Sequence, residues 1–553
     1  MGRHRLMEID KDTYVPMRDG VCLAVDLYRP SELTTHAAVV LVTPYQKDAA
    51  FQMPLGSDGR PIQLPLPPMP AGLNPMLMSV QPLVDAGFVV AVADARGTGF
   101  SEGVYDYYNL RGGPFDGHDL VEWVADQPWC TGHVGIMGAS AAAISCYITA
   151  LTKPPHLEAM AANMHPGDFY FDQWRVGGVF RFDNRIGWSV GMHQRTAPID
   201  PGDRDAPSYE RKRAVYEARF MHYGERVASS KNAANLDWLT DMYEHDLYDD
   251  YWKERSFIRR ANEITIPTLH GGVWYDHFIR GTLTSHEAID VPKRLLVAPG
   301  SLMTRTDLGD GGLGKLHVAW FDHFLRGADN GVLDEPPVRL YLMGKEDYID
   351  EPAWPVPAVD TPFFLAAGPT GSASSLNDGA LVPSVGEDDE PDAITHDPSA
   401  PNRTPADVAD QRPFEAGCLT YTSEPLDADL EVIGTPRLVL YASSDAPDVD
   451  WCVRLCDVAP DGRSKLLNTG ALKGSHVESH ETPVALHAGK VYRFEVEVWP
   501  IANLFKVGHR IRIDVSTSDF PFFEANPCAS RNHVFHGATR PSLLVLPVVD
   551  RRG

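Results

Sequence analysis

The sequence has no long apolar run and is short of basic residues. No stretch of 18 apolar residues occurs among its 553 residues, so no membrane-spanning helix is predicted. Lys and Arg number 49 against 75 Asp and Glu, which gives a net charge of −26. A surface this acidic repels phosphate backbones and anionic lipids, so neither nucleic acid nor a membrane is expected as a partner.

Cysteine is also scarce. The chain holds seven, an odd number, which is no disulfide framework. Cys452 and Cys456 are four residues apart, but they lie in a run that has a strand pattern, with no histidine nearby, so no metal site is predicted. The first residues, MGRHRLMEID, contain no apolar segment of a signal peptide. We therefore expect an acidic, soluble, cytoplasmic protein without metal or cofactor; a homo-oligomer is compatible with these features.

Strand and helix patterns alternate along the first part of the chain. Two β-rich runs flank the Asp19-Gly20 turn, which is typical of a hairpin. A buried-strand pattern at 87–103 then precedes a helical pattern at 116–129, and residues 133–151 again combine a strand pattern with a helical pattern after it. Residues 152–255 are rich in aromatic and charged residues with helical spacing, and we expect no strand there. The strand pattern returns at 264–298. This order predicts a parallel sheet interrupted by a helical cap.

The last 200 residues have a different character. A stretch rich in Pro, Gly, Ser and Asp covers 352–415, and several short β-patterned runs follow it. Such a pattern is typical of an all-β sandwich or jelly roll. The predicted domains are 1–151 and 256–352 for the two parts of the α/β domain, 152–255 for the cap, and 353–553 for the β-domain.

The strongest chemical signal is Ser140 in the segment Gly138-Ala-Ser-Ala-Ala142. A strand pattern runs into Ser140 and a helical pattern leaves it, as in the nucleophile elbow of an α/β hydrolase. The sharp turn requires small residues two before and two after the serine, and Gly138 and Ala142 meet this need. The N–H of Ala141 would then face a developing oxyanion. From this motif alone, an equally good interpretation is that Ser140 caps the N-terminus of the helix.

Asp276 follows the first strand pattern after the cap. In α/β hydrolases the acid comes after the serine in the chain and follows a late strand, so Asp276 is the candidate acid. The alternative is an aspartate that caps the helix beginning near His277.

Together these segments resemble the CocE/NonD family, the cocaine esterase and X-prolyl dipeptidyl-peptidase group of serine hydrolases. Nine segments in family order carry the resemblance: 15–30, 43–48, 94–103, 116–140, 270–278, 320–327, 396–405, 518–527 and 540–548. The resemblance implies an α/β-hydrolase domain with a helical cap, a C-terminal jelly roll, and activity on a small ester or amide, of acyl or X-Pro type. It also implies that Ser140 is the nucleophile, that Asp276 orients the catalytic histidine, and that the Tyr45 hydroxyl completes the oxyanion hole with the Ala141 N–H.

The chain departs from the family pattern beside the nucleophile and at the histidine. The family has Tyr directly after the serine and Gly two residues later, where this chain has Ala141 and Ala143. Aligned on Pro299, the position of the family histidine is Leu302, and no histidine lies between His286 and His317. A leucine cannot carry a proton. Without a histidine, subtilisin loses about 10⁶ in kcat, so an unassisted Ser140 would be a poor esterase.

Two hypotheses follow from the missing histidine. In the first, a surrogate supplies the base: the cap holds His165, His193 and His222, and His277 adjoins Asp276, although neighbouring side chains usually point apart. His323 is expected to be structural. In the second hypothesis, the scaffold has lost hydrolysis and binds a ligand or catalyses a cyclisation or acyl transfer. A gain of esterase activity in Leu302→His would favour a dormant triad.

The remaining motifs say less about the substrate. The segment 51–79 is rich in methionine and the cap is rich in aromatic residues. These side chains would flank the cleft and suit an apolar acyl or aryl group of the substrate. Alternatively, they pack the cap onto the sheet. The glycine-rich turn at 96–99 is too short to indicate phosphate binding, and Arg96 is expected to form a buried structural ion pair.

Overall fold

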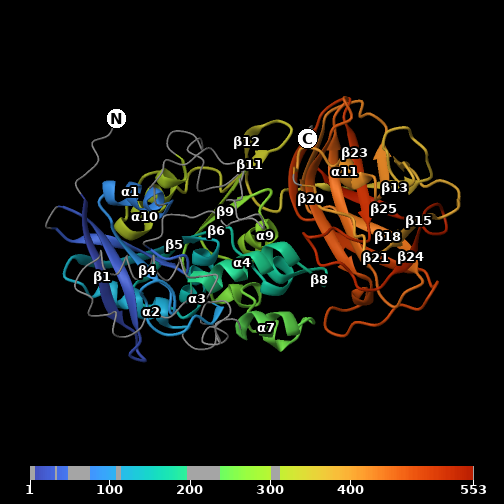
Figure 1. Cartoon of the computed structure of the whole chain (residues 1–553). Helices are drawn as coiled ribbons and strands as arrows, with labels where there is room; N and C mark the ends of the chain where they lie inside the picture. The colour runs from blue at the N-terminus through green and yellow to red at the C-terminus, as the bar shows by residue number, and fades with distance from the viewer. Residues whose placement is uncertain are drawn as a thin grey trace.

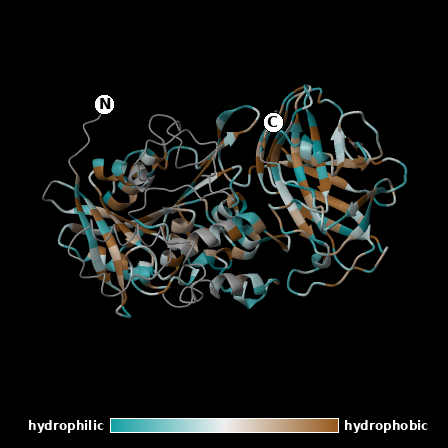
Figure 2. Cartoon of the chain, in the orientation of Figure 1, coloured by the Kyte–Doolittle hydropathy of each residue, from teal (hydrophilic) through white to brown (hydrophobic). Residues whose placement is uncertain are grey.

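A computed structural model describes residues 7–31, 34–47, 75–107, 114–195, 237–299, 312–405 and 407–551. Within these residues two large sheets stand side by side (Figure 1). Strands form the hydrophobic centre of both halves, while polar residues gather on the loops (Figure 2). None of the described helices combines the length and the apolar character that crossing a bilayer requires.

The first sheet has ten described strands, in the order β1-β2-β4-β3-β5-β6-β9-β10-β11-β12. Their bounds are β1 Met7–Pro16, β2 Cys22–Pro30, β3 His36–Thr43, β4 Val89–Asp94, β5 Cys130–Ala139, β6 Leu157–Asn163, β9 Thr268–Val273, β10 Lys293–Ala298, β11 Val338–Leu342 and β12 Asp347–Glu351. The pairs from β4 through β11 are parallel, and the outer pairs are antiparallel. The expected hairpin and the parallel sheet are therefore confirmed.

Helices cover both faces of this sheet. On one face α1 (Pro75–Asp85) packs with α10 (Gly312–Arg326) over a cluster that includes Trp320 and Phe321. On the other face lie α2 (Asp116–Ala125) and α3 (Ala141–Leu151), and α9 (Ile279–Ala288) packs against β9. Because apolar helices bury both faces, the central strands are apolar on both sides, as β3, with His36 at its start, illustrates.

The cap is not purely helical. Its segment, predicted as 152–255, contains β6, which pairs with β5 and β9 in the sheet, so the expectation of no strand there is wrong. The alanine-rich run of β6 is extended because two neighbouring strands bury it, which overrides the helical preference of alanine. The insertion that follows β6 includes the π-helical turn η2 (Tyr170–Trp174), a ribbon of β7 (Arg175–Val176) and β8 (Val179–Phe180), α4 (Phe182–Arg195), α7 (Asp237–Glu244), α8 (Asp250–Lys253) and η5 (Ile258–Glu263).

The second sheet system has 13 described strands and forms the β-domain. Its elements are β13 Val359–Ala366, β14 Gly379–Val382, β15 Asp392–His396, α11 Arg412–Glu415, β16 Leu419–Ser423, β17 Leu430–Gly434, β18 Arg437–Ser444, β19 Asp450–Val458, β20 Ser464–Lys473, η6 Gly474–His476, β21 Tyr492–Glu497, β22 Ile501–Phe505, β23 Arg510–Ser516, β24 Ser530–Phe535 and β25 Leu543–Val548. The described pairs are antiparallel except β14 with β16. The α/β-hydrolase domain with a C-terminal jelly roll is thus confirmed.

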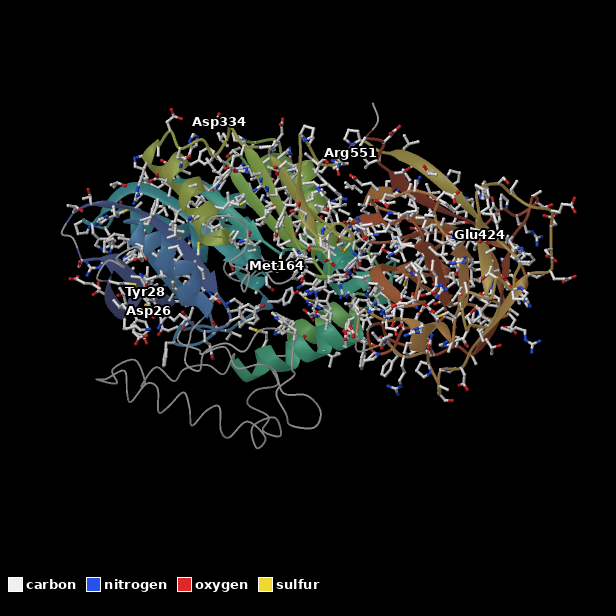
Figure 3. All side chains as sticks on the ribbon, turned by 90° about the horizontal axis from the view of Figure 1, so that it is seen from above. Asp26, Tyr28, Met164, Asp334, Glu424 and Arg551 are labelled. Carbon is white, nitrogen blue, oxygen red and sulfur yellow. The ribbon has the colours of Figure 1, made fainter. Side chains whose placement is uncertain are left out.

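The two halves are joined by polar contacts. Arg551, labelled between the halves in Figure 3, contacts Glu351 of β12 and Glu431 of β17. The cap ribbon also touches the β-domain, since Gly177 accepts a hydrogen bond from the N–H of Lys473 at 2.8 Å. The β-domain therefore supports the cap beside the sheet.

The glycine-rich turn is structural, as predicted. Arg96 donates to both carboxylate oxygens of Asp116, at 2.9 and 2.5 Å, and to Asp19 at 2.7 Å. A side chain at Gly99 would place its Cβ 2.1 Å from the Asp94 carboxylate, so the turn wraps that group too closely for any other residue.

Candidate functional site

Ser140 lies in a strained turn between β5 and α3. Its φ of 56° and ψ of −122° are outside the regions that L-residues favour. The turn is held by the Ser140 N–H, which donates to Asn163 O of β6 at 2.9 Å. A Cβ at Gly138 would lie 2.3 Å from the carbonyl carbon of Ala142, which is why that position needs glycine. The backbone thus adopts an elbow, and the Ser140 side chain does not cap α3.

The Tyr45 hydroxyl meets this serine. Tyr45 follows the carboxyl end of β3, and its OH lies 3.2 Å from Ser140 Oγ. The indole N–H of Trp188 in α4 donates to the same phenol oxygen at 3.2 Å. Because an indole N–H only donates, the phenol hydrogen remains available for Ser140 or an oxyanion near it.

The turn that carries Tyr45 is fixed by a buried lysine. The Lys47 N–H donates to Asp94 at 2.6 Å, and its ammonium pairs with Asp12 at 2.7 Å and Asp26 at 2.9 Å. Ala141 supplies the other expected donor, since it is the first residue of α3, where backbone N–H groups lack partners within the helix. The helix dipole further favours negative charge at this end.

Asp276 follows β9 and holds the neighbouring histidine. Its Oδ1 lies 3.2 Å from His277 Nδ1, and its Oδ2 accepts the N–H of Phe278 at 3.0 Å. Burial acts to raise the pKa of Asp276, but His277, the Phe278 N–H and Arg181 together hold the pKa below its ordinary value. The expectation that adjacent side chains point apart is therefore wrong here: the turn after β9 folds the imidazole back onto the carboxylate.

The far side of His277 faces the cap. Arg185 of α4 has Nη2 3.2 Å from His277 Nε2, and Arg181, just before α4, donates from Nη1 to His277 O at 3.4 Å. Removal from water lowers the pKa of His277 to about 4, with Asp276 acting against this and the two arginines acting with it. The imidazole is thus neutral near pH 7, with Nδ1–H toward Asp276.

Three further described histidines contact groups other than the Ser140 hydroxyl. His165 is fully buried, with its ring 4.4 Å from that of Tyr147 in α3, and its Nε2 has no hydrogen-bond partner among the described residues. Burial lowers its pKa to about 4. His317 Nε2 is 3.4 Å from Nδ2 of Asn163, the residue whose carbonyl accepts the Ser140 N–H. His323 bonds Ala328 O at 2.9 Å and is structural, as expected.

Several expected residues lie outside what the structure describes: Leu302, His222, the side chain of His193, and most of the segment 51–79. In the described part of the chain, Ser140 Oγ is hydrogen-bonded to Tyr45 and to no imidazole. The structure brings Ser140 and Tyr45 together and gives Asp276 a histidine partner. It leaves the base of Ser140 to be assigned.

Sequence reasoning missed the arginines of the cap. Arg181, Arg185 and Trp188 recur at intervals of four and three residues, which puts them on one helix face. On this face, Arg185 contacts His277, which follows β9, and Trp188 contacts Tyr45, which follows β3. Strand β5, which ends at Ser140, lies between β3 and β9 in the sheet. The spacing was the available signal, but only the fold shows that this face lies over the carboxyl edge of the sheet.

The aromatic residues of the cap pack largely on one another. The Tyr107 ring stacks on Trp238 at 5.0 Å and meets the edges of Trp174 and Trp188 at 5.8 Å. This cluster reaches Ser140 through Trp188 and Tyr45, so it forms one wall of the candidate site.

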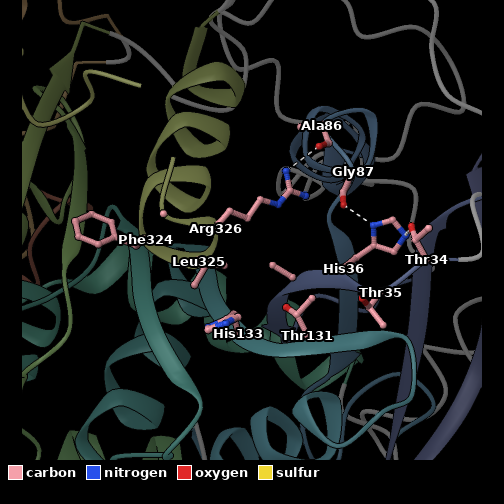
Figure 4. A pocket seen from close by; sticks show the side chains of 12 residues that line it. Thr34, Thr35, His36, Ala86, Gly87, Thr131, His133, Phe324, Leu325 and Arg326 are labelled. Atoms are coloured by element: carbon pink, nitrogen blue, oxygen red, sulfur yellow. Dashed lines mark hydrogen bonds between the residues drawn. The ribbon is translucent and has the colours of Figure 1, made fainter. Parts of the chain in front are cut away.

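A cavity of about 760 Å³ lies at the opposite edge of the sheet (Figure 4). It is lined at the amino ends of β3 and β5 by residues such as Thr131 and His133. Its polar groups have partners within the protein: His36 bonds Gly87 O at 2.9 Å, and Arg326 donates to Ala86 O at 3.0 Å. Catalytic groups of parallel sheets gather at the carboxyl ends, so this cavity is separate from the Ser140 site.

Comparisons with known proteins agree with this arrangement. Residues 19–301 match the model of the X-Pro dipeptidyl-peptidase (S15 family), and residues 330–545 match that of the X-Pro dipeptidyl-peptidase C-terminal non-catalytic domain. Cocaine esterase of Rhodococcus sp. is 29% identical over 98% of this chain and 99% of its own length. A putative Xaa-Pro dipeptidyl-peptidase of Bacillus anthracis is 23% identical, over 79% of this chain and 70% of its own.

Solved structures share the fold. A CocE/NonD family hydrolase from Staphylococcus aureus superposes with a TM-score of 0.74 at 22% identity, covering 98% of this chain and 94% of its own. An aminopeptidase from a Thaumarchaeota archaeon superposes with a TM-score of 0.77 at 20% identity, covering 99% and 97%. The chain therefore shares its fold, over almost its whole length, with both structures.

Proposed function

Because the chain belongs to the X-Pro dipeptidyl-peptidase (S15) family and is similar along almost its whole length to a cocaine esterase, we propose that it hydrolyses a small ester or amide through Ser140. The observation that carries the proposal is the Tyr45 hydroxyl 3.2 Å from Ser140 Oγ at a positive-φ elbow. A strained backbone lowers the stability of the folded state, and such strain is concentrated at active sites.

In the first half of the reaction, Ser140 Oγ attacks the substrate carbonyl. The new C–O bond turns the carbonyl oxygen into an oxyanion, which the Tyr45 O–H and the Ala141 N–H stabilise. When this intermediate collapses, the bond to the leaving alcohol or amine breaks and an acyl–Ser140 ester remains. Water then attacks that ester in the same way and releases the acid.

A base must take the Ser140 proton and return it to the leaving group. We assign this role to His277, since it is the described histidine that Asp276 orients. The hydrogen bond from Nδ1 to Asp276 leaves the lone pair on Nε2, the arrangement that a general base requires. Because β9 stands two strands from β5, or roughly 10 Å, the imidazole must turn from Arg185 toward Ser140 to act.

The test is steady-state hydrolysis of p-nitrophenyl acetate, p-nitrophenyl butyrate and an X-Pro p-nitroanilide by the wild type and by Ser140→Ala. We expect hydrolysis of at least one of them, lost in Ser140→Ala. His277→Ala should lose it too, whereas His323→Ala, on a structural histidine, should keep it. A folded wild type inert toward all three, or an active Ser140→Ala, would favour the alternative of a scaffold that binds a ligand or catalyses non-hydrolytic chemistry.

A further inference from the structure

We propose that Arg181 and Arg185 form a subsite for a carboxylate of the substrate. The inference rests on the proposed function and names its substrate class: an ester or amide that carries a free carboxylate a few bonds from the scissile carbonyl. Four features of the cap carry it, namely the state of Arg181, the contact of Arg185 with His277, the position of Arg181 just before α4 and of Arg185 within it, and the contrast with the buried arginines Arg454 and Arg512.

Arg181 is a buried cation with open donors. It is 2% exposed, and its Nη1 donates to His277 O at 3.4 Å, while its Nε has no hydrogen-bond partner. The guanidinium packs on the rings of Trp499 and Phe522, whose centres lie 4.9 and 4.8 Å from Cζ. Stacked rings satisfy the faces of a guanidinium but leave its edge, the side that binds carboxylates, free to donate.

Some buried arginines of this chain are neutralised by carboxylates, whereas Arg175, like Arg181, forms no ion pair among the described residues and has an Nε without a hydrogen-bond partner. Arg454 pairs with Asp519 at 2.7 Å and Arg512 with Glu415 at 2.7 Å. Among the residues that the structure describes, Arg181 forms no such ion pair, although the chain carries a net charge of −26. Asp183 and Asp276 favour the charged form of Arg181 from a distance, but neither is ion-paired with it. A buried charge without a contacting carboxylate is expensive, so the lack of an ion pair in so acidic a protein points to a ligand that brings the negative charge.

Arg185 connects this subsite to the proposed base. Asp276 holds the proton of His277 on Nδ1, so Nε2 is an acceptor, and Arg185 Nη2 donates to it at 3.2 Å. Arg185 also donates to Asn184 Oδ1. A carboxylate accepts from a guanidinium more strongly than a neutral imidazole does. A substrate carboxylate would therefore draw Arg185 from Nε2 and release the lone pair that the reaction needs.

The position of the pair on the cap sets the length of the substrate. Arg181, Arg185 and Trp188 lie on one face, and Trp188 reaches Ser140 through two contacts of 3.2 Å with Tyr45. Along the helix axis the Arg185 and Arg181 positions lie three and seven residues before Trp188, or roughly 5 and 10 Å. This span suits half-esters of four- or five-carbon dicarboxylic acids.

A purely structural role for Arg181 makes a different prediction. If Arg181 only packs on Trp499 and Phe522 and so holds the cap against the β-domain, its replacement would lower the rate for every substrate by the same factor. A carboxylate subsite affects anionic substrates selectively. The ratio of kcat/KM for a charged and a neutral ester therefore separates the two roles.

The experiment compares p-nitrophenyl hemisuccinate with p-nitrophenyl 4-methylpentanoate, which has a neutral branched end of similar shape. For the wild type, we expect kcat/KM to be at least about tenfold higher for the hemisuccinate, the gain of one charge-assisted hydrogen-bonded pair. In Arg181→Gln this ratio should fall to about one. Arg175→Gln, which removes a cap arginine that is equally buried but donates to Tyr243 O, should keep the wild-type ratio.

A wild-type ratio of one, or an unchanged ratio in folded Arg181→Gln, would overturn the subsite while leaving the serine hydrolase intact. If Arg181→Gln does not fold, inhibition of wild-type hydrolysis of the neutral ester by glutarate, but not by glutaramide, is the expected result, and equal effects overturn the subsite. If neither ester is hydrolysed, the proposed function fails. Calorimetric titration of Ser140→Ala with glutarate then judges the subsite alone: binding is expected, and no binding overturns it.

Discussion

Tyr45 is the residue that contacts the hydroxyl of Ser140 in the described part of the chain. Its hydroxyl is the hydrogen-bond partner of Ser140 Oγ, and Trp188 positions that hydroxyl from the cap. The side chain therefore joins the nucleophile, the sheet and the cap in one contact chain. A conservative change at Tyr45 separates the role of the hydroxyl from that of the ring.

Tyr45→Phe keeps the ring and removes one oxyanion donor. Loss of one such donor typically costs 10²–10³ in kcat. We expect kcat for p-nitrophenyl butyrate to fall by about that factor while KM changes little. Tyr243→Phe, which removes a cap hydroxyl bonded to Glu524 at 2.9 Å, is the matched control and should retain full activity. Wild-type kcat in Tyr45→Phe would remove Tyr45 from the oxyanion hole.

The pH dependence reports the base. The pKa of His277 is lowered to about 4, so the neutral form that accepts a proton persists well into the acid range. The rate kcat/KM should therefore fall only as the pH drops through about 4, rather than through about 6.5 as for an ordinary histidine. A measured acid limb near 6.5 would assign the base to a different group.

Asp276→Asn tests the positioning of that histidine. Asparagine keeps the shape but offers no charge to hold Nδ1–H, so kcat should drop by about 10⁴, the size of the corresponding change in trypsin. Asp276 also supports the protonated form of His277, and its loss should move the acid limb to lower pH. Asp461→Asn, at an exposed aspartate of the β-domain paired with Arg463, should change neither quantity.

At the scale of elements, the junction of β5 and α3 is the feature that the sequence predicts best. A buried strand, small residues on both sides of Ser140 and an immediate helix leave few other conformations. Strand β6 was missed because its alanines favour a helix by local preference, and only the neighbours β5 and β9 make it a strand. Local pattern thus predicts the elbow but not elements whose conformation depends on their partners.

Gly138→Ala should disrupt the elbow. The added Cβ would lie 2.3 Å from the carbonyl carbon and 2.4 Å from the carbonyl oxygen of Ala142, and neither backbone atom can move without opening the turn. We expect a loss of at least about 2 kcal/mol in the free energy of unfolding, measured by chemical denaturation, together with loss of activity. Gly386→Ala is the control, because a Cβ there meets nothing within 4 Å. Unchanged stability in Gly138→Ala would contradict the elbow geometry.

At the scale of the whole molecule, the resemblance of nine segments predicted the layout of an α/β domain, a cap and a β-domain. It did not predict which side chains meet across these parts. The contact of His277 with Asp276 depends on the turn after β9, and the placement of Arg181 between Trp499 and Phe522 requires the β-domain to support the cap. Such contacts join residues far apart in the chain, and no local spacing encodes them.

Buried neutral histidines make the fold sensitive to acid. The pKa is lowered to about 4 for His165, His277 and His317 and to about 3 for His286, chiefly by burial. In the unfolded chain these histidines take up protons near pH 6.5, so stability should fall as the pH drops from 6.5 to 4 and level off for this contribution below about 3. Denaturation at pH 7 and pH 5 should show a lower midpoint at pH 5.

His286→Gln should reduce this difference between pH 7 and pH 5, because it removes one group that protonates only on unfolding. His133→Gln, at a largely exposed histidine paired with Glu158, should leave the difference unchanged. An equal difference in the wild type and in His286→Gln would show that carboxylates, not histidines, govern the acid sensitivity.

The central claim is that Ser140 is an activated nucleophile, and its most direct test is labelling with a fluorophosphonate followed by intact-mass measurement. A fluorophosphonate reacts with a serine only where a base removes the proton and an oxyanion hole accepts the charge. We predict fast, stoichiometric addition of one label to the wild type and none to Ser140→Ala. A wild type that is folded by circular dichroism and stays unlabelled would contradict the serine-hydrolase account.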